Sequence, residues 1–162
     1  MAAVQNRNGF TLVEVLIAVI LVGLSITALV MSSNSFTMAN SIGADLSTAE
    51  FLVEQIRELT VLLPVVDPTT GVATFGPEEP NLATYDDIDD FDTLTFSPPI
   101  SAAREALNDL AGFSQYVTVQ NVLASNFETV QADHSTSFVR ITVSVRKNGE
   151  EITSASWLRA RF

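Results

Sequence analysis

The chain contains an apolar run, Phe10 to Met31, that is long enough to cross a membrane and yet holds one acid, Glu14. The run has 22 residues, and about 20 helical residues span the hydrocarbon core of a bilayer. A carboxylate at that depth costs roughly 2.5–3.5 kcal/mol on insertion scales, so it is usually kept for a function. The run therefore predicts a membrane-spanning helix over 10–31 and marks Glu14 as a functional residue.

Three simpler interpretations of the run explain it less well. A buried core helix is rarely this apolar over this length. A secretory signal peptide has an apolar centre of about 7–15 residues and a small-residue cleavage site; "VMSSNS" offers such a site, but the run is too long and contains an acid. An ordinary single-pass anchor fits the length and leaves Glu14 unexplained.

The residues "GFTLVEVLIAVILVGL", Gly9 to Leu24, follow a short polar leader with Arg7. This stretch resembles the class III leader of type IV prepilins and type II secretion pseudopilins. The resemblance implies that residues 1–9 are a leader, that prepilin peptidase cuts between Gly9 and Phe10, and that the new amine of Phe10 is methylated. It also implies that other pilin or pseudopilin subunits, the inner membrane and an assembly platform are partners.

In the resembling family, the acid at the position of Glu14 pairs with the N-terminal amine of a neighbouring subunit. Each of these charges is expensive alone in lipid, and each relieves the desolvation of the other where they meet. Such a pair would favour adding subunits in one register.

The composition excludes several classes of function. The net charge is -11, from 19 acidic and 8 basic residues, which argues against nucleic acid as a partner because its phosphates are neutralised by Lys and Arg. The chain has no cysteine, which excludes disulfides, zinc-thiolate sites and a cysteine nucleophile. His134 is the only histidine and lies in a polar segment, and the motifs of hydrolases, phosphate-binding loops and zinc proteases are absent. We therefore expect no enzyme.

The apolar pattern continues past the membrane-length run at steps of three and four, which predicts an amphipathic helix over 32–63 that ends before Pro64. "SSNS" at 32–35 has poor helix propensity and predicts a local bend. We expect one continuous helix from Phe10 to about Leu63; the alternative is two helices joined near 32–40. The apolar positions are Met38, Ile42, Leu46, Ala49, Val53, Ile56, Leu59 and Leu63.

Residues 114–162 predict an antiparallel sheet. "FVRITVSV" and "ITSASWLRARF" alternate with period two around Asn148-Gly149, the strongest short hairpin signal. With these two residues at the tip, one face is expected to be buried against the helix, while the other holds an ion pair and a cation–π contact. The buried pairs are Val145–Ile152, Val143–Ser154, Ile141–Ser156 and Val139–Leu158, and the outer pairs are Arg146–Glu151 and Arg140–Trp157.

Four further elements are expected outside the hairpin. "SQYVTVQNV" at 114–122 predicts a third strand, and 93–96 and 71–75 are weaker strand candidates. A short helix is expected over 102–110. The fold class is then α+β and type IV pilin-like, with a long N-terminal helix packed on a small antiparallel sheet.

The region 64–113 is irregular and acidic, with seven acids between Glu78 and Asp92. Clustered oxygen ligands suit calcium, and Asp87, Asp89 and Asp92 are the candidate ligands. The EF-hand pattern is absent, so a solvated acidic loop is the favoured alternative. A third interpretation docks the acids on basic surfaces of adjoining subunits, such as the group Arg140, Arg146, Arg159 and Arg161.

The sequence thus predicts a structural subunit, of the minor kind, in a bacterial type IV pilus or type II secretion pseudopilus, with its head in the periplasm. The minor kind is favoured because the chain lacks a cysteine pair and carries Met31 where many major pilins have a proline. The alternative is a membrane-anchored periplasmic binding module that never polymerises and whose acidic loop binds a cation or a partner.

Overall fold

The computed structural model describes residues 9–67 and 75–161. Its first element, helix α1, runs from Leu12 to Thr60 without interruption over 49 residues. The expectation of one continuous helix is confirmed, and the alternative of two helices joined near 32–40 is wrong. The helix continues through the serine-rich stretch, where the Ser35 hydroxyl donates to the Met31 carbonyl at 3.0 Å.

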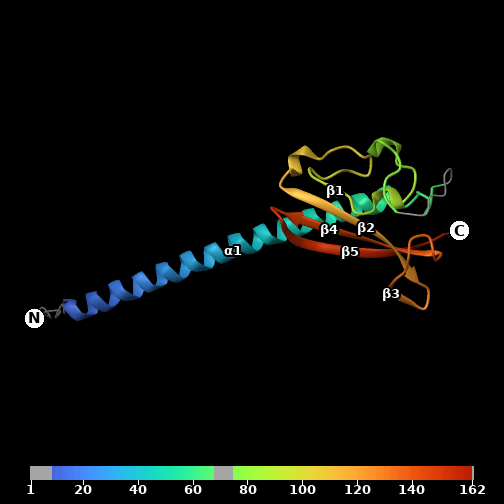
Figure 1. Cartoon of the computed structure of the whole chain (residues 1–162). Helices are drawn as coiled ribbons and strands as arrows, with labels where there is room; N and C mark the ends of the chain where they lie inside the picture. Colours follow the sequence, from blue (N-terminus) through green and yellow to red (C-terminus); the bar gives the residue numbers. More distant parts are fainter. Residues whose placement is uncertain (1–8, 68–74, 162) are drawn as a thin grey trace, which may run out of the picture. The chain divides into compact units, whose positions relative to one another are not determined.

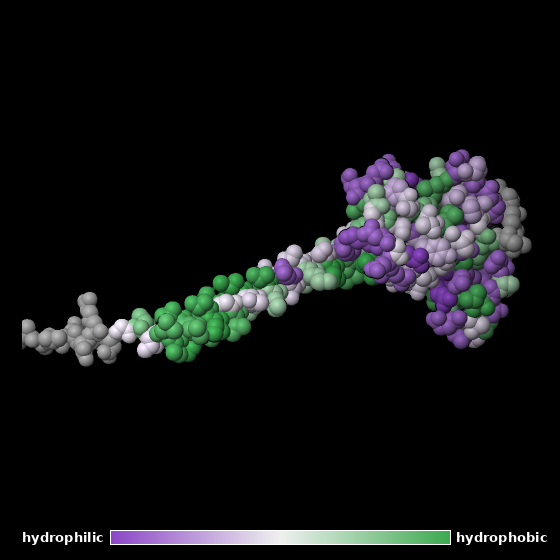
Figure 2. Space-filling model, turned by 60° about the vertical axis from the view of Figure 1, so that its left-hand side comes forward, coloured by the Kyte–Doolittle hydropathy of each residue, from purple (hydrophilic) through white to green (hydrophobic). Residues whose placement is uncertain are grey.

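The chain divides into two compact units, residues 1–43 and residues 44–162. In the first unit, every side chain from Gly9 to Gly43 is exposed. Figure 2 shows the hydrophobic surface that results over the first part of α1. Within the described ranges, α1 is the one helix long and apolar enough to cross a membrane.

Hydroxyl groups inside the apolar half of α1 are satisfied by the helix itself. Ser25 donates to the Leu21 carbonyl at 2.8 Å, and Thr27 donates to the Gly23 carbonyl at 2.9 Å. Such back-bonding allows hydroxyl side chains to lie in an apolar environment without an unmet donor. The carboxylate of Glu14 has no equivalent way of removing its charge.

The second unit holds the last part of α1 and an antiparallel sheet. The strands are β1 (Thr95–Phe96), β2 (Phe113–Leu123), β3 (Asn126–Val130), β4 (Phe138–Lys147) and β5 (Glu150–Ala160). Their order is β1-β2-β4-β5, and β3 pairs with the end of β2. The strands expected at 93–96, at 114–122 and in the hairpin are therefore confirmed, while β3 was not predicted. The candidate at 71–75 lies almost wholly outside the described residues.

The core forms where α1 lies against one face of β2 and β4 (Figure 1). The helix contributes Ala49, Leu52, Val53, Ile56 and Leu59, and β4 contributes every second residue from Val139 to Val145. Met38 and Ile42, which the sequence placed on the same apolar stripe, are more than half exposed. The stripe therefore has partners within this chain only over its last three turns.

Gln115 joins three parts of the second unit from within the core. Its side chain is fully buried. Its amide nitrogen donates to the carbonyls of Leu52 in α1 and of Ile100, and its amide oxygen accepts from the Ile100 N–H at 2.8 Å. A buried amide with its hydrogen bonds made fixes the helix, the loop and β2 in one arrangement.

The hairpin turn forms as expected. Beyond the pair Arg146–Glu151, however, the pairing of β5 with β4 is shifted by one residue from the predicted register. Asn148 and Gly149 have φ of 52° and 90°, as a type I′ turn requires. Arg146 pairs with Glu151 as predicted, whereas Val145 pairs with Thr153. Ile152 is therefore the extra residue of a β-bulge.

The bulge exchanges the two faces of β5, because a slip of one residue moves every later side chain to the other side of a sheet. Trp157 now pairs with Ile141 and packs against the core, and Leu158 is 41% exposed. The expected pairs Val145–Ile152, Val143–Ser154, Ile141–Ser156 and Val139–Leu158 are wrong, as is the contact of Arg140 with Trp157. The guanidinium over the Trp157 ring is that of Arg57, at 5.7 Å.

The end of α1 explains why this register is the stable one. Arg159 donates to the carbonyls of Thr60, Val61 and Leu63 at 2.8–3.1 Å. The last carbonyls of a helix lack partners within the helix, and a cation there also suits the helix dipole. The bulge thus brings both Trp157 and Arg159 onto the last turns of α1.

Two other expectations for this unit are not met. The helix expected over 102–110 is absent from that segment, which holds a bridge between Ile100 and Ala106 and a short 3₁₀ turn, Asn108–Leu110. Arg104 has a φ of 65°, which no residue inside a right-handed helix adopts. The Arg146 guanidinium lies 6.0 Å from the centre of the Tyr116 ring, and no ion pair joins it to Glu151 in the described part of the chain.

Replacing Trp157 by alanine is predicted to destabilise the second unit far more than the same change at Leu158. Trp157→Ala removes a large side chain from the core edge and leaves a cavity, a loss of roughly 2–4 kcal/mol, whereas Leu158→Ala is expected to cost less than about 1 kcal/mol. Denaturant unfolding of the two variants gives both values. A larger loss of stability for Leu158→Ala would contradict the bulge and favour the register predicted from the sequence.

Candidate functional site

Glu14 takes part in the capping of α1. Its backbone N–H donates to the Thr11 hydroxyl at 3.3 Å, and its Oε2 accepts from the Thr11 N–H at 3.4 Å. This reciprocal pair is a capping box, in which the acid lies three residues after the capping threonine. Its signature, Thr-x-x-Glu before an apolar run, is readable in the sequence at 11–14 and was missed.

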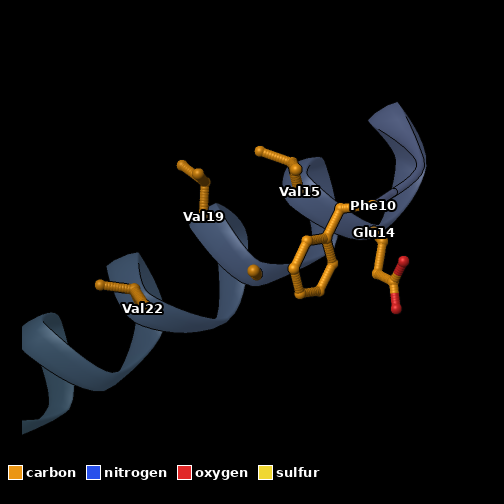
Figure 3. A pocket seen from close by; sticks show the side chains of 6 residues that line it. Phe10, Glu14, Val15, Val19 and Val22 are labelled. Carbon is orange, nitrogen blue, oxygen red and sulfur yellow. The ribbon is translucent and has the colours of Figure 1, made fainter. Parts of the chain in front are cut away.

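The side chains of Phe10 and Glu14 lie close together at the start of the helix. Figure 3 shows the two side chains next to each other, with Val15, Val19 and Val22 projecting from the opposite edge of the helix as drawn. These five residues and Ala18 line a shallow apolar groove. Among the residues that the structure describes, no basic side chain pairs with Glu14, and its Oε1 accepts no hydrogen bond. A carboxylate in this groove therefore presents an unpaired charge in apolar surroundings.

Gly9 and Phe10, the residues on either side of the expected cleavage point, precede the first helical residue, Leu12. Phe10 is 85% exposed, and a side chain added at Gly9 would meet no atom within 4 Å. This peptide bond is free of packing in the described chain. It is therefore accessible to an enzyme.

A second group of polar residues lies in the loop between α1 and the sheet, and it differs from the solvated loop favoured by the sequence. Asp87, Asp89 and Asp90 are buried, with at most 1% of each residue exposed. The loop is held by hydrogen bonds from the Ile88 N–H to the Pro64 carbonyl and from the Gly76 N–H to the Asp89 carbonyl. Two short 3₁₀ turns, Leu82–Thr84 and Asp89–Phe91, shape it.

The three predicted calcium ligands have different surroundings. Asp87 accepts from the Asp90 N–H at 3.1 Å and belongs to a group of carboxylates with Asp86 and Asp90. Asp89 lies 3.3 Å from Nε2 of His134, whose ring packs edge-on against Phe75. Asp92 accepts from the Val119 N–H at 2.7 Å and so anchors the loop to β2.

The residue that connects the acids is Asp90, which the sequence did not single out. It belongs to two groups whose ligand oxygens lie within 4.8 Å of one another, one with Asp86 and Asp87 and the other with Glu78 and Glu79. The spacing of the acids along the sequence does not predict that Asp90 is central, because its burial depends on the 3₁₀ turn Asp89–Phe91. Tertiary folding also brings Glu78 and Glu79 to the group.

Burial and neighbouring carboxyl groups raise the pKa values of five acids in this loop, Glu78, Glu79, Asp86, Asp89 and Asp92. Burial and the close carboxyl group of Asp87 raise the pKa of Asp89 to about 9, and the close carboxyl group of Asp90 raises the pKa of Glu79 to about 7. Burial is also the main cause of the raised pKa values of Glu78, Asp86 and Asp92. The folded loop therefore favours neutral acids or a compensating positive charge.

These shifts predict that the second unit loses stability as pH rises in buffer free of divalent cations. Because the folded pKa of Asp89 is raised from 3.8 to about 9, its contribution is complete below the unfolded value and is lost as pH rises through the folded value. The melting temperature should fall by several degrees between pH 5 and pH 9. Asp89→Asn should flatten this dependence, and Asp109→Asn, at an exposed acid outside the loop, should not. A melting temperature that rises over this range would contradict the assignment.

The comparisons with known proteins agree with the geometry of the N-terminus. Residues 4–30 match the model of the prokaryotic N-terminal methylation motif. No curated protein and no solved structure shows a significant match to the chain. The match spans 27 of the 162 residues, so it describes the N-terminal segment and not the whole chain. The chain therefore carries an N-terminal methylation motif, and its α+β fold of one long helix on an antiparallel sheet is pilin-like.

Proposed function

We propose that the chain is a structural subunit of a bacterial type IV pilus or type II secretion pseudopilus. The observation that carries this proposal is the first part of α1, where every described side chain up to Gly43 is exposed and Glu14 has no basic partner. An apolar surface of this length needs lipid or other apolar helices around it. Subunits that pass from the inner membrane into a filament meet both in turn.

Processing is the first step of the proposed function. Prepilin peptidase cuts between Gly9 and Phe10 and methylates the new amine, while residues 10–31 hold the chain in the inner membrane and the second unit lies in the periplasm. The match to the methylation motif over residues 4–30 supports this order of events.

Assembly is the second step and uses Glu14. Its Oε1 accepts no hydrogen bond within the described chain, so it is available to the amine of Phe10 in a neighbouring subunit. An ion pair formed in apolar surroundings offsets the desolvation of both charges only when the two groups meet closely. The platform would therefore add subunits in a single register.

A minor subunit is the finer assignment within this function. The absence of cysteine excludes the disulfide that closes the C-terminal loop of many major pilins, and α1 runs through Met31 without a proline. The abundance of the chain relative to the main subunit in purified filaments tests this assignment.

The mass of the protein isolated from its native membrane is predicted to correspond to a chain that starts at methylated Phe10. Gly9→Val should block this processing without disturbing the fold, because the added side chain meets no atom within 4 Å. Gly23→Ala, at a glycine with equal space, serves as the control and should be processed normally. A wild-type chain that retains residues 1–9 in the presence of the peptidase would favour the non-polymerising, membrane-anchored binding module instead.

Substitutions at Glu14 can separate its charge from its role in capping. Glu14→Gln keeps the capping box, since glutamine also serves at this position, and removes the charge, whereas Thr11→Ala weakens the cap and keeps the charge. We expect Glu14→Gln and Glu14→Ala to be cleaved normally and to lose at least tenfold in filament incorporation, and Thr11→Ala to assemble. Incorporation is measured by quantifying the subunit in sheared filaments. Normal assembly of Glu14→Gln would contradict a role for its charge and would leave capping of α1 as the only role of Glu14.

A further inference from the structure

The five acids Glu78, Glu79, Asp86, Asp87 and Asp90, here called the acidic cluster, meet at one place in the loop between α1 and β1. Asp90 belongs to both groups of carboxylates, in which the ligand oxygens lie within 4.8 Å of one another. Oxygens this close repel one another unless protons or a cation lie between them. Acids lie close together on many protein surfaces without a bound cation, and most of those acids are exposed to solvent.

Three buried oxygens of the acidic cluster have no hydrogen-bond partner among the described residues. Asp87 and Asp90 are both 0% exposed, yet within residues 9–67 and 75–161 Oδ2 of Asp87 and Oδ1 of Asp90 have no hydrogen-bond partner, and neither does the buried Oε2 of Glu79. A buried polar atom without a partner costs about 1–3 kcal/mol, and a charged one costs more. Each of these oxygens belongs to a carboxylate of the cluster.

Backbone N–H groups fix the orientation of the two central carboxylates. Asp90 Oδ2 accepts from the N–H groups of Asp86 and Asp87 at 3.0 and 3.4 Å, and Asp87 Oδ1 accepts from the Asp90 N–H at 3.1 Å. One oxygen of each carboxylate is therefore held by the loop. The other oxygen of each is left for a ligand.

Basic side chains do not neutralise the cluster within the described residues. The ion pairs of residues 9–67 and 75–161 involve Glu54, Asp45, Glu128 and, through His134, Asp89, and none of the five acids. Arg104, which contacts the same loop, donates to the carbonyls of Leu82, Ala83 and Tyr85. Its guanidinium thus shapes the backbone that leads into the cluster and forms no pair with these carboxylates.

We propose that the acidic cluster binds one calcium ion, with Asp86, Asp87 and Asp90 as the central ligands and Glu78 and Glu79 completing the shell. The donors are all carboxylate oxygens, which are the ligands of hard divalent cations. Calcium accepts several of them in flexible geometry, whereas magnesium demands near-octahedral geometry and keeps much of its water. The set shares only Asp87 with the ligands expected from the sequence, because Asp89 faces His134 and Asp92 anchors β2.

The test compares thermal unfolding of the full-length protein in detergent, in buffer depleted of cations and after addition of millimolar CaCl₂ or MgCl₂. Calcium should raise the melting temperature by roughly 5–10 °C when its free concentration is about 100 times the Kd. Magnesium should give a clearly smaller rise. No shift with calcium, or an equal shift with magnesium, would overturn the proposal.

Three variants locate the effect. Asp90→Asn should abolish the calcium shift and melt no lower than the wild type in depleted buffer, because it removes a buried charge and keeps an oxygen that can accept from Asp86 and Asp87. Asp86→Asn changes an exposed residue of the same shell and should weaken binding at least tenfold, even where Asp90→Asn fails to fold. Asp92→Asn is the matched control in the same loop, and it should retain the shift. Loss of the shift in Asp92→Asn alone would overturn the assignment of ligands.

Terbium luminescence provides a direct measure of occupancy. Tyr85 directly precedes Asp86 of the cluster in the chain, and burial, followed by the charges of Asp90 and Glu79, raises its pKa. We therefore expect its phenol to transfer energy to a bound Tb³⁺ ion. Excitation of tyrosine should give terbium emission that calcium displaces and that Asp90→Asn abolishes. Tyr85→Phe should lose most of the emission and keep the calcium shift in melting temperature. Emission that is unchanged in Asp90→Asn would place the ion elsewhere.

Discussion

Helix α1 buries side chains within its own chain only from Ala49 onwards. Up to Gly43 it is an exposed and mainly apolar helix, and from Ala49 the same helix is the centre of a folded unit. The elements of the second unit are arranged around this constraint. The buried face of β2 and β4 covers the last turns, Gln115 bonds to the helix backbone at Leu52, and Arg159 satisfies its final carbonyls. The other part of the helix can be stable only in an environment that the chain does not itself supply.

The two groups of acids follow the same principle. Glu14 and the acidic cluster both lack basic partners among the described residues, and both are held in place by backbone N–H groups. Natural folds keep unpaired carboxylates in apolar or crowded surroundings where something else neutralises them. For Glu14 that partner is proposed to be the amine of another subunit, and for the cluster a metal ion. In both cases the chain supplies the negative half of an interaction completed from outside.

Local signals in the sequence were sufficient to predict α1 and the strands β1, β2, β4 and β5, but long-range contacts decided their register and surroundings. The apolar run and the period of three and four predicted α1, and Asn148-Gly149 predicted the position of the hairpin turn. The bulge at Ile152 could not be predicted in this way, because it follows from the contacts of Trp157 and Arg159 with the last turns of a helix that lies about 100 residues earlier. The prediction of a helix over 102–110 was wrong for a related reason. Arg104 has a positive φ, which a right-handed helix does not allow, and its guanidinium donates to the carbonyls of Leu82, Ala83 and Tyr85.

The two candidate sites also differ in how far the sequence predicted them. Glu14 was identified because its motif is contiguous, although the capping box within that motif was overlooked. The acidic region was recognised by composition, but the burial of Asp87, Asp89 and Asp90 and the central position of Asp90 depend on how the loop folds against the helix and β2. Acidic residues in a sequence are usually expected to be exposed to solvent. Here the 3₁₀ turn at Asp89–Phe91 places Asp89 and Asp90 in the interior of the fold.

The bond from Arg159 to the end of α1 sets an order on the formation of the molecule during synthesis. Arg159 and Thr60 are 99 residues apart, and a chain is made and exported from its N-terminus. The apolar part of α1 is therefore complete while the strands that will cover Leu52 and Ile56 have yet to be made. Throughout that interval the helix end has open carbonyls and an uncovered apolar face, which are features that quality-control proteases and chaperones recognise. A chain cut short before β5 would keep its hydrophobic N-terminal helix and lack both Trp157 and Arg159, so the end of α1 would stay uncovered.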